Sequence, residues 1–303
     1  MAEPVLTTVT RTQGANQALK DGSVTPTGFS FAFEEIPVLV KGFRRMVRSL
    51  EFDVSEMALT TYLTAREHGV AFTALPIFLV RGFHHGAIRY NTKSGIRDPK
   101  DLEGRRVGVN RGYTVTTGVW ARGILASEFG VDLQSVRWVL SGDEHVASYV
   151  PPANVEPATG DLADMLINNE IDAVIGVDVQ HPDVAPLIPD PDDAAIRALR
   201  ERAFYPINHL IVVKDSVLQR YPKVARAVFD AFSEAKQRYV AQLRDGVVTD
   251  RVLSPVLQLT GADPLPYGVE ANRPMLEQLM EFAMAQRILT RPVHLDEMFA
   301  DVE

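Results

Sequence analysis

The segment RRVGVNRGYTVTTGVWARGILASEF, residues 105–129, contains the pattern that decides the fold. Residues 105–110 are predicted to form a strand, Arg111-Gly112-Tyr113 a short loop, and residues 116–129 a helix. A strand that passes through a tight loop into a helix is one half of a parallel strand–helix–strand unit. The segment therefore predicts an α/β protein.

Strands and helices alternate on both sides of this segment as well. The predicted strands cover residues 5–10, 28–33, 52–57, 72–80, 136–140, 171–177 and 210–213. The predicted helices cover residues 16–20, 37–50, 60–68, 161–169, 222–243, 273–285 and 295–299. This order predicts mixed, mostly parallel sheets with helices on both faces.

The length of the chain and one break in the pattern together predict two lobes. A chain of 303 residues is about twice the usual size of a single core, and the pattern starts again at Asn91. We therefore expect residues 91–205 to form an inserted lobe, and residues 1–90 plus 206–303 to form the outer lobe with the C-terminal helices. Strands near Ile88 and Leu210 are expected to cross between the lobes as a hinge.

Composition excludes several classes of function. The net charge of −8 argues against a nucleic-acid partner, and the absence of cysteine excludes disulfides and thiolate chemistry. No apolar run is long enough to span a membrane, so no membrane partner is expected. Residues 1–11 carry no signal-peptide pattern, so we expect a cytoplasmic protein. A homo-oligomer remains compatible with the sequence.

Threonine-rich turns at two predicted helix starts indicate anion binding. Thr60 and Thr61 form one turn, and Tyr113, Thr116 and Thr117 belong to the other. Helix N-termini carry unpaired N–H donors and partial positive charge, so carboxylates bind there readily. The threonines are equally compatible with plain N-caps. Their pairing across a cleft between lobes favours a site for a small anion.

Histidines and a glutamate near the predicted hinge supply candidate catalytic groups. His85 follows one strand, His209 lies at the second crossing, and Glu56 is expected at the C-terminal end of its strand. These three side chains could act as acid and base, or could hold a divalent metal ion. No tight metal-binding spacing such as His-Glu-x-x-His is present. The metal is therefore only one of two alternatives.

Arginines are the third group of candidates. Arg81, Arg111 and Arg122 could each bind a carboxylate with a bidentate fork, and Arg81 is favoured because it leaves a strand just before His84 and His85. The chain has no Gly-x-Gly-x-x-Gly or phosphate-loop pattern. We therefore expect no nucleotide, and neither flavin nor pyridoxal phosphate as a cofactor.

Several longer segments resemble one family. They are residues 52–57 (FDVSEM), 101–109 (DLEGRRVGV), 119–125 (VWARGIL), 205–209 (YPINH) and 263–273 (DPLPYGVEANR). With these segments the chain resembles the 4,5-dihydroxyphthalate decarboxylases, which have a type II periplasmic binding-protein fold without a leader. The resemblance implies decarboxylation of an aromatic carboxylate bound in the inter-lobe cleft, with protocatechuate as product.

The chain departs from this family pattern in two places. Residues 83–86 are Phe-His-His-Gly where the family has Phe-Arg-His-Ser, and residues 176–181 lack an arginine that the family carries there. Both segments are expected at the cleft, so they bear on the substrate rather than on the fold. Two alternatives follow: a related enzyme for another aromatic acid, or a non-catalytic binding protein for a small carboxylate or amine that feeds a transporter or sensor.

The implied reaction sets what the site must contain. Direct loss of carbon dioxide from the ring would leave an unstable aryl anion, whereas protonation of the ring carbon para to a hydroxyl avoids it. We expect His85 or His209 to donate that proton and Glu56 to act as base or metal ligand. Arg81 and the threonine turns are expected to hold the second carboxylate.

Overall fold

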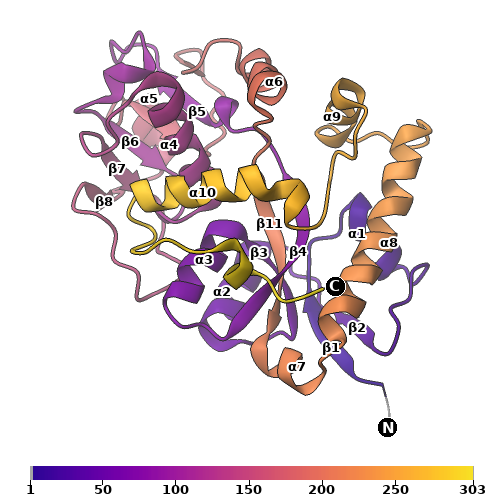
Figure 1. The fold of residues 1–303 in the computed structure, drawn as a ribbon. Helices are drawn as coiled ribbons and strands as arrows, with labels where there is room; N and C mark the ends of the chain where they lie inside the picture. The colour runs from indigo at the N-terminus through magenta and orange to yellow at the C-terminus, as the bar shows by residue number, and fades with distance from the viewer. Residues whose placement is uncertain (1–2, 303) are drawn as a thin grey trace. The chain divides into compact units, whose positions relative to one another are not determined.

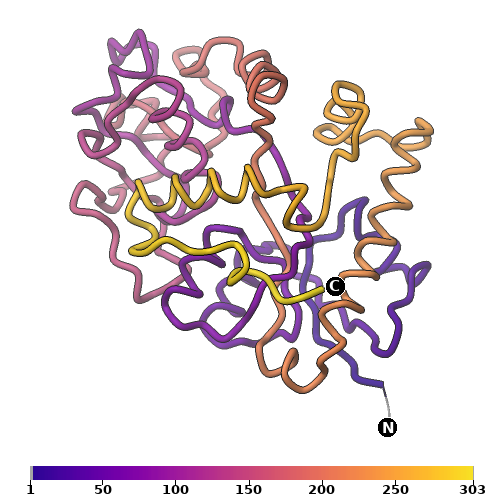
Figure 2. The backbone as a smooth tube through the Cα atoms, in the orientation of Figure 1, coloured from indigo at the N-terminus to yellow at the C-terminus, as the bar shows by residue number. Residues whose placement is uncertain are grey.

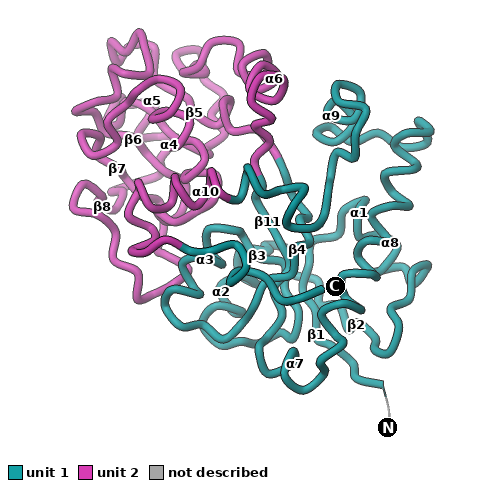
Figure 3. The backbone as a smooth tube through the Cα atoms, viewed as in Figure 1, with its two compact units in different colours: residues 1–81, 207–276, 293–303 teal, residues 82–206, 277–292 magenta. Residues whose placement is uncertain are grey.

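The computed structural model describes residues 3–302, and its chain divides into two compact units (Figure 3). The first unit consists of Met1–Arg81, Ile207–Leu276 and Val293–Glu303. The second consists of Gly82–Pro206 and Glu277–Pro292. Figure 2 traces the chain through these segments from end to end.

The first unit is built on a five-stranded sheet with the order β2-β1-β3-β11-β4 (Figure 1). Its strands are β1 (Val5–Val9), β2 (Ser30–Phe33), β3 (Val54–Ala58), β4 (Phe72–Arg81) and β11 (Ile207–Lys214). Strand β1 pairs in parallel with β2 and β3, and β11 runs antiparallel between β3 and β4.

The helices of the first unit follow the strands. They are α1 (Gly14–Lys20), α2 (Leu39–Ser49), α3 (Leu59–Glu67), α7 (Asp215–Arg220), α8 (Val224–Arg244), α9 (Leu253–Thr260) and α11 (Leu295–Met298), with a short 3-10 turn at Glu270–Asn272. Apolar residues of α8, including Val228 and Phe232, pack with Val54, Ile211 and Val213 of the sheet. Long β-branched runs in β11 are buried because a helix covers them.

The second unit is built on a six-stranded sheet with the order β10-β5-β9-β6-β7-β8. Its strands are β5 (Ile88–Asn91), β6 (Arg106–Val109), β7 (Arg137–Leu140), β8 (Val155–Pro157), β9 (Ala173–Ile175) and β10 (Val184–Pro186). Strands β6 to β9 pair in parallel, and β5 runs antiparallel to β9 and β10. The predicted mixed, mostly parallel α/β sheets are therefore confirmed.

Helices of the second unit include α4 (Thr116–Phe129), α5 (Leu162–Ile167), α6 (Pro191–Arg202) and most of α10 (Arg273–Ala285), with 3-10 turns at His85–Ala87 and Pro99–Leu102. Leu162 and Leu166 of α5 pack with Val139 and Val174 of the sheet. Trp120 of α4 meets Phe282 of α10 edge to face, with ring centroids 5.8 Å apart. The strand–loop–helix pattern of residues 105–129 thus appears as β6 and α4.

The observed units differ in extent from the predicted lobes. The second unit begins at Gly82, whereas position 91 was expected, and it also takes in residues 277–292. The reason is that Phe282 of α10 packs on Trp120 of α4, and periodicity in α10 reveals an apolar face but not its partner. The predicted crossing strands are β5, which lies within the second unit, and β11, which lies within the first.

Among residues 3–302, no helix combines the length and the apolar character that crossing a membrane requires.

Candidate functional site

A histidine and a glutamate form a hydrogen-bonded pair on the sheet of the first unit. Glu56 on β3 lies beside Ile211 of β11, and His209 is two residues from Ile211 along the same strand. Side chains two residues apart in a strand share a face, so the two groups meet. His209 Nδ1 lies 2.6 Å from Glu56 Oε1. Glu56 is the third residue of β3, which corrects its predicted place at the end of the strand.

The surroundings of this pair fix its hydrogen-bond direction. Glu56 is fully buried, and its Oε2 accepts the backbone N–H of Arg11 at 2.9 Å. A carboxylate only accepts, so Nδ1 of His209 donates to Oε1 and Nε2 is left for proton exchange. The His209 side chain is 17% exposed, and the Phe43 ring packs against it edge to face. The imidazole is thus the accessible member of the pair.

The threonines at the start of α3 are inside the helix. Strand β3 passes into α3 without a loop, so Ala58 is the N-cap. Its methyl side chain cannot accept a hydrogen bond from the helix. Thr60 and Thr61 are fully buried and neither is the N-cap, whereas their predicted part in anion binding stays a prediction. What this helix start offers a ligand is its backbone N–H groups.

Arg81, at the end of β4, contacts the segment 263–273. Its Nη1 donates to Asn272 Oδ1 at 2.7 Å. The Asn272 amide in turn donates to the carbonyls of Pro266 and Gly268, and Gly268 N–H bonds to the carbonyl of Pro76. The segment 263–273 is thereby fastened to β4. Whether Arg81 also binds a carboxylate stays a prediction.

Tyr267, in the same segment, is a polar group that the sequence did not single out. Its hydroxyl is buried and has no hydrogen-bond partner among the described residues. Burial raises the pKa of this phenol, and the carboxylates of Asp263 and Glu56 raise it further. The Lys236 ammonium lies 5.0 Å from the ring centroid. Tyr267 therefore remains a neutral phenol at any ordinary pH.

The second unit has a pocket at the start of α4. The cavity measures about 190 Å³ and lies at the C-terminal ends of β6 and β9. Its lining includes Asn110, Arg111, Thr117 and Gly176. In open α/β sheets this edge is where ligands bind. Two predicted residues, Arg111 and Thr117, thus line one pocket.

An acidic side chain occupies the turn before this helix. Glu144 accepts hydrogen bonds from the backbone N–H groups of Tyr113 and Thr114, and from Thr114 Oγ1 at 2.6 Å. A Cβ at Gly112 would lie 2.6 Å from Glu144 Oε2, so a side chain at position 112 would displace the Glu144 carboxylate. The predicted anion-binding turn at Tyr113 therefore already binds a carboxylate of the protein. Nothing in the local sequence signals this contact between two loops.

The helix start itself also differs from the cap that was predicted. Val115 is the N-cap of α4 and makes no side-chain cap, so Thr116 and Thr117 lie inside the first turn. Thr116 is buried and does not line the pocket, whereas Thr117 does. The first-turn N–H groups of this helix are the donors that a bound anion would use.

Arg122 has a structural role in place of the predicted carboxylate clamp. It is fully buried, its Nε donates to Gln286 Oε1 at 2.7 Å, and its Nη2 donates to the carbonyl of Tyr113 at 2.6 Å. The guanidinium also lies 3.9 Å from the centroid of the Tyr113 ring. Burial lowers the pKa of Arg122. Arg122 does not reach solvent, and its contacts hold the carbonyl and the ring of Tyr113 in place.

His85 belongs to the second unit, whereas Glu56 and His209 belong to the first. It is fully buried, with Nε2 3.3 Å from Glu128 Oε1, and the same oxygen accepts Arg202 Nη2 at 2.5 Å. Burial raises the pKa of Glu128, but hydrogen bonds from His85 and Arg202 outweigh it, so the pKa is lowered overall. His209 is thus paired with Glu56, and His85 is paired with Glu128.

The residues suggested for a metal ion do not form one ligand set within a unit. The first unit supplies Glu56 and His209, and the second supplies His85. Across residues 3–302, no three His, Asp or Glu side chains gather as metal ligands. Two ligands fall short of the usual set for a transition metal. A divalent metal stays a prediction, and no step below uses one.

Comparison with known sequences gives two relatives with the same name, while no protein-family model matches the chain. The chain is 29% identical over 281 residues to 4,5-dihydroxyphthalate decarboxylase of Comamonas testosteroni, covering 85% of this chain and 84% of the relative. It is 34% identical over 169 residues to 4,5-dihydroxyphthalate decarboxylase of Pseudomonas putida, covering 50% of this chain and 65% of the relative.

Solved structures with the same fold include binding proteins and an enzyme. The alkanesulfonate-binding protein SsuA from Xanthomonas axonopodis pv. citri, bound to MOPS, aligns with a TM-score of 0.52 at 13% identity, over 99% of this chain and 98% of that one. The desulfurization enzyme DSZB aligns with a TM-score of 0.53 at 15% identity, over 98% and 96%. At such identities the likeness concerns the fold alone. The chain is therefore similar in sequence to two 4,5-dihydroxyphthalate decarboxylases and has a periplasmic binding-protein-like fold.

Proposed function

We propose that this protein is a carboxy-lyase that removes carbon dioxide from a hydroxylated aromatic acid. The substrate that we propose is 4,5-dihydroxyphthalate, with protocatechuate as product. The names of two relatives support the reaction class. The observation that carries the chemical part of the proposal is the Glu56–His209 pair, in which a buried carboxylate orients a partly exposed imidazole.

The proposed reaction begins with a proton from His209. With Nδ1–H bonded to Glu56, the protonated imidazole delivers the proton on Nε2 to the ring carbon that bears the carboxylate. The hydroxyl para to that carbon releases its proton, and the ring becomes a dienone. The carbon–carbon bond then breaks, carbon dioxide leaves, and its electron pair restores the aromatic ring as the dienone oxygen regains a proton. One proton is consumed per carbon dioxide released.

Glu56 orients His209 for proton donation. One oxygen of the Glu56 carboxylate accepts the Nδ1–H of His209 and the other accepts the Arg11 N–H, so the imidazole is held in one orientation. General acid help of this kind contributes about two to four orders of magnitude in rate. Glu56 is therefore a positioning residue, and His209 is the proposed proton donor.

Carboxylates of the substrate need cationic or N–H partners. The pocket at the start of α4 offers Arg111, Thr117 and the first-turn N–H groups, and it contains no acidic side chain in its lining. A helix N-terminus binds a carboxylate by its dipole and its unpaired donors. We infer that this pocket receives an anionic group of the ligand.

The alternative function is binding without turnover. The same fold is found in SsuA, whose structure contains MOPS, so a ligand-binding protein for a small anion would need no change of architecture. A binding protein does not need an oriented proton donor, whereas a decarboxylase does. The Glu56–His209 pair favours the enzyme.

One incubation separates these functions. Purified full-length protein is mixed with 4,5-dihydroxyphthalate in D₂O, and the products are followed by chromatography and proton NMR. The proposal predicts protocatechuate with one deuterium at the carbon that lost its carboxylate, and one carbon dioxide per turnover. Saturable binding of the substrate without product would support the binding protein instead.

A further inference from the structure

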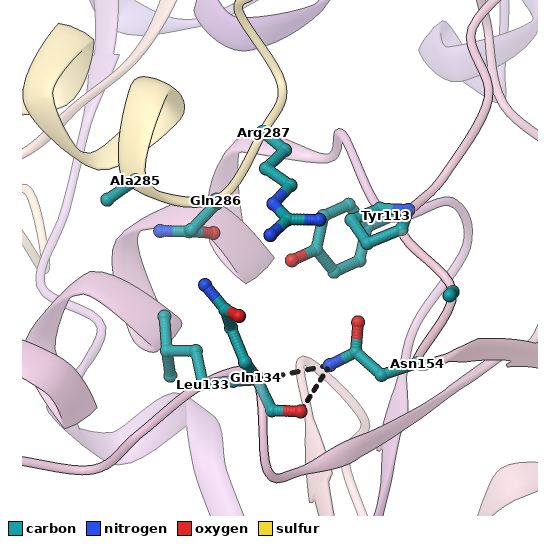
Figure 4. A pocket seen from close by; sticks show the side chains of 9 residues that line it. Tyr113, Leu133, Gln134, Asn154, Ala285, Gln286 and Arg287 are labelled. Atoms are coloured by element: carbon teal, nitrogen blue, oxygen red, sulfur yellow. Dashed lines mark hydrogen bonds between the residues drawn. The ribbon is translucent and has the colours of Figure 1, made fainter.

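A second polar pocket lies in the second unit, beside the end of α10. The cavity measures about 170 Å³, and Figure 4 shows the side chains around it. Its lining includes Tyr113, Leu133, Gln134, Asn154, Gln286 and Arg287. None of the lining residues is acidic, and Arg287 is the one cation among them. Tyr113 is the link to the first pocket, because its neighbours Arg111 and Val115 line that one.

Arg287 is held toward this pocket by an unusual backbone conformation. Its φ of 58° is left-handed, which costs an arginine roughly 1–2 kcal/mol. The conformation is fixed on both sides, because Arg287 N–H bonds to the carbonyl of Met284 and Tyr149 Oη donates to the carbonyl of Arg287 at 3.3 Å. No ion pair of Arg287 occurs among the described residues. The backbone of Arg287 is thus fixed, and its side chain lines a cavity whose lining contains no acidic residue.

The other walls are fastened in place by the protein. Asn154 Nδ2 donates to the carbonyls of Leu133 and Val136 at 3.0 and 2.8 Å. Gln286 is buried, with its amide oxygen on Arg122 and its amide nitrogen on the carbonyl of Val119. Figure 4 shows the Asn154 oxygen and the Gln134 amide turned toward the space near Arg287. Asn154 and Gln286 are thus held in place before any ligand arrives, so binding need not rearrange them.

Tyr113 contributes a rigid, mostly buried part of the wall, since the residue is 3% exposed. Arg122 lies against this ring at 3.9 Å from its centroid, which fixes its position. A small planar ligand would meet only the exposed part of this residue while its charged end faces Arg287. Arginine binds carboxylates through two parallel hydrogen bonds, and amide groups beside it add neutral donors.

We propose that this pocket is a second binding site, specific for a small aromatic monocarboxylate. Arg287 binds the carboxylate, the Gln134 amide donates to it, and the ring packs beside Tyr113. The ligand would touch the same residue whose backbone N–H holds Glu144. The site is separate from the pocket at the start of α4, and it does not depend on the proposed catalytic activity.

The probe for this proposal is 4-fluorobenzoate, followed by fluorine NMR of the ligand on the full-length protein. The wild type is expected to bind it with a dissociation constant of about 1 mM or lower. Arg287→Ala should weaken this binding at least tenfold. Arg287→Lys should restore only part of the affinity, because an ammonium cannot form the two-pronged contact.

Two further variants keep the test decisive. Arg291→Ala removes the same charge from the same exposed segment without touching the cavity, and its affinity should stay within twofold of the wild type. Gln134→Glu leaves Arg287 intact but adds a negative charge to the wall, and it should abolish binding. Equal effects of Arg287→Ala and Arg291→Ala, or no binding of the probe to the wild type, would overturn the proposal.

Discussion

His209 differs from His85 in what holds its ring. A histidine whose Nδ1 bonds a buried carboxylate has one tautomer and one orientation, so its second nitrogen always faces the same way. His85 also has a carboxylate neighbour, but that contact is longer, at 3.3 Å, and the imidazole is fully buried. At the scale of single residues, accessibility therefore separates the two histidines that the sequence treated as equivalents.

Glu56→Gln tests the orienting role. The amide has one oxygen acceptor in place of two, so it cannot hold both Arg11 N–H and His209 Nδ1–H. We expect kcat for 4,5-dihydroxyphthalate to fall by about two orders of magnitude with little change in KM. Steady-state kinetics that separate kcat from KM would check this. A variant with unchanged kcat would exclude Glu56 from the reaction.

Glu144 gives a second prediction, which concerns binding. Glu144→Ala removes the acceptor that holds the Tyr113–Thr114 turn, and the neighbouring pocket should lose its shape. The affinity for 4,5-dihydroxyphthalate, measured by calorimetry, should fall roughly tenfold, which corresponds to about 1.4 kcal/mol. The affinity of Glu144→Gln should lie between those of the wild type and Glu144→Ala.

The control for this experiment is Glu170→Gln, which removes an exposed charge of the same unit. Tighter binding by Glu144→Ala would mean that Glu144 competes with the ligand for the turn, contrary to the positioning role.

At the scale of elements, α4 joins three features of the second unit: a pocket, the buried Arg122 and the contact with α10. Its N-terminus borders the pocket, its middle carries Arg122, and its Gly123 faces α10. A Cβ at Gly123 would overlap the Phe282 ring. The glycine is thus a condition for the close contact of the two helices.

Gly123→Ala should therefore destabilise the protein although alanine favours helices. Overpacking of this kind costs about 1–3 kcal/mol, and each kcal/mol lowers Tm by roughly 2–4 °C in a protein of this size. Ser127→Ala, on the exposed side of the same helix, is the matched control. Differential scanning calorimetry measures both, and an equal Tm for the two variants would contradict the packing argument. Phe282→Leu in the Gly123→Ala background should recover part of the loss.

Elements were predictable from the sequence where their own periodicity determines them. Strand β1 and helix α4 follow from patterns within a few residues, and both were placed within about one residue. The contacts that define the site join distant positions: Arg81 with Asn272, Tyr113 with Glu144, and α4 with α10. Local patterns contain no information on such partners. The register that joins Glu56 to His209 likewise depends on how β11 pairs with β3.

At the scale of the whole molecule, charge pairs inside each unit link stability to pH. Glu128 has a lowered pKa in the folded state because His85 and Arg202 bond its carboxylate more strongly than burial opposes it. Its contribution to stability is therefore present above the ordinary carboxyl pKa, and it is lost as pH falls through the lowered one.

Glu128→Gln should remove this contribution. The difference in urea midpoint between wild type and variant should be large near about pH 7 and should shrink as the pH falls through the lowered pKa of Glu128, below which both side chains are neutral. Unfolding curves at four or five pH values would check it. A difference that stays constant over this range would show that the ion pair does not stabilise the fold.

The proposed function of the whole molecule is decarboxylation, with His209 as the proton donor. The most direct measurement is the turnover of 4,5-dihydroxyphthalate by the wild type, His209→Ala and His294→Ala, an exposed histidine of the same unit. We predict protocatechuate from the wild type and from His294→Ala at equal rates, and a loss of at least about a hundredfold for His209→Ala with its Tm unchanged. Equal turnover by His209→Ala, or no protocatechuate from the wild type, would contradict the account.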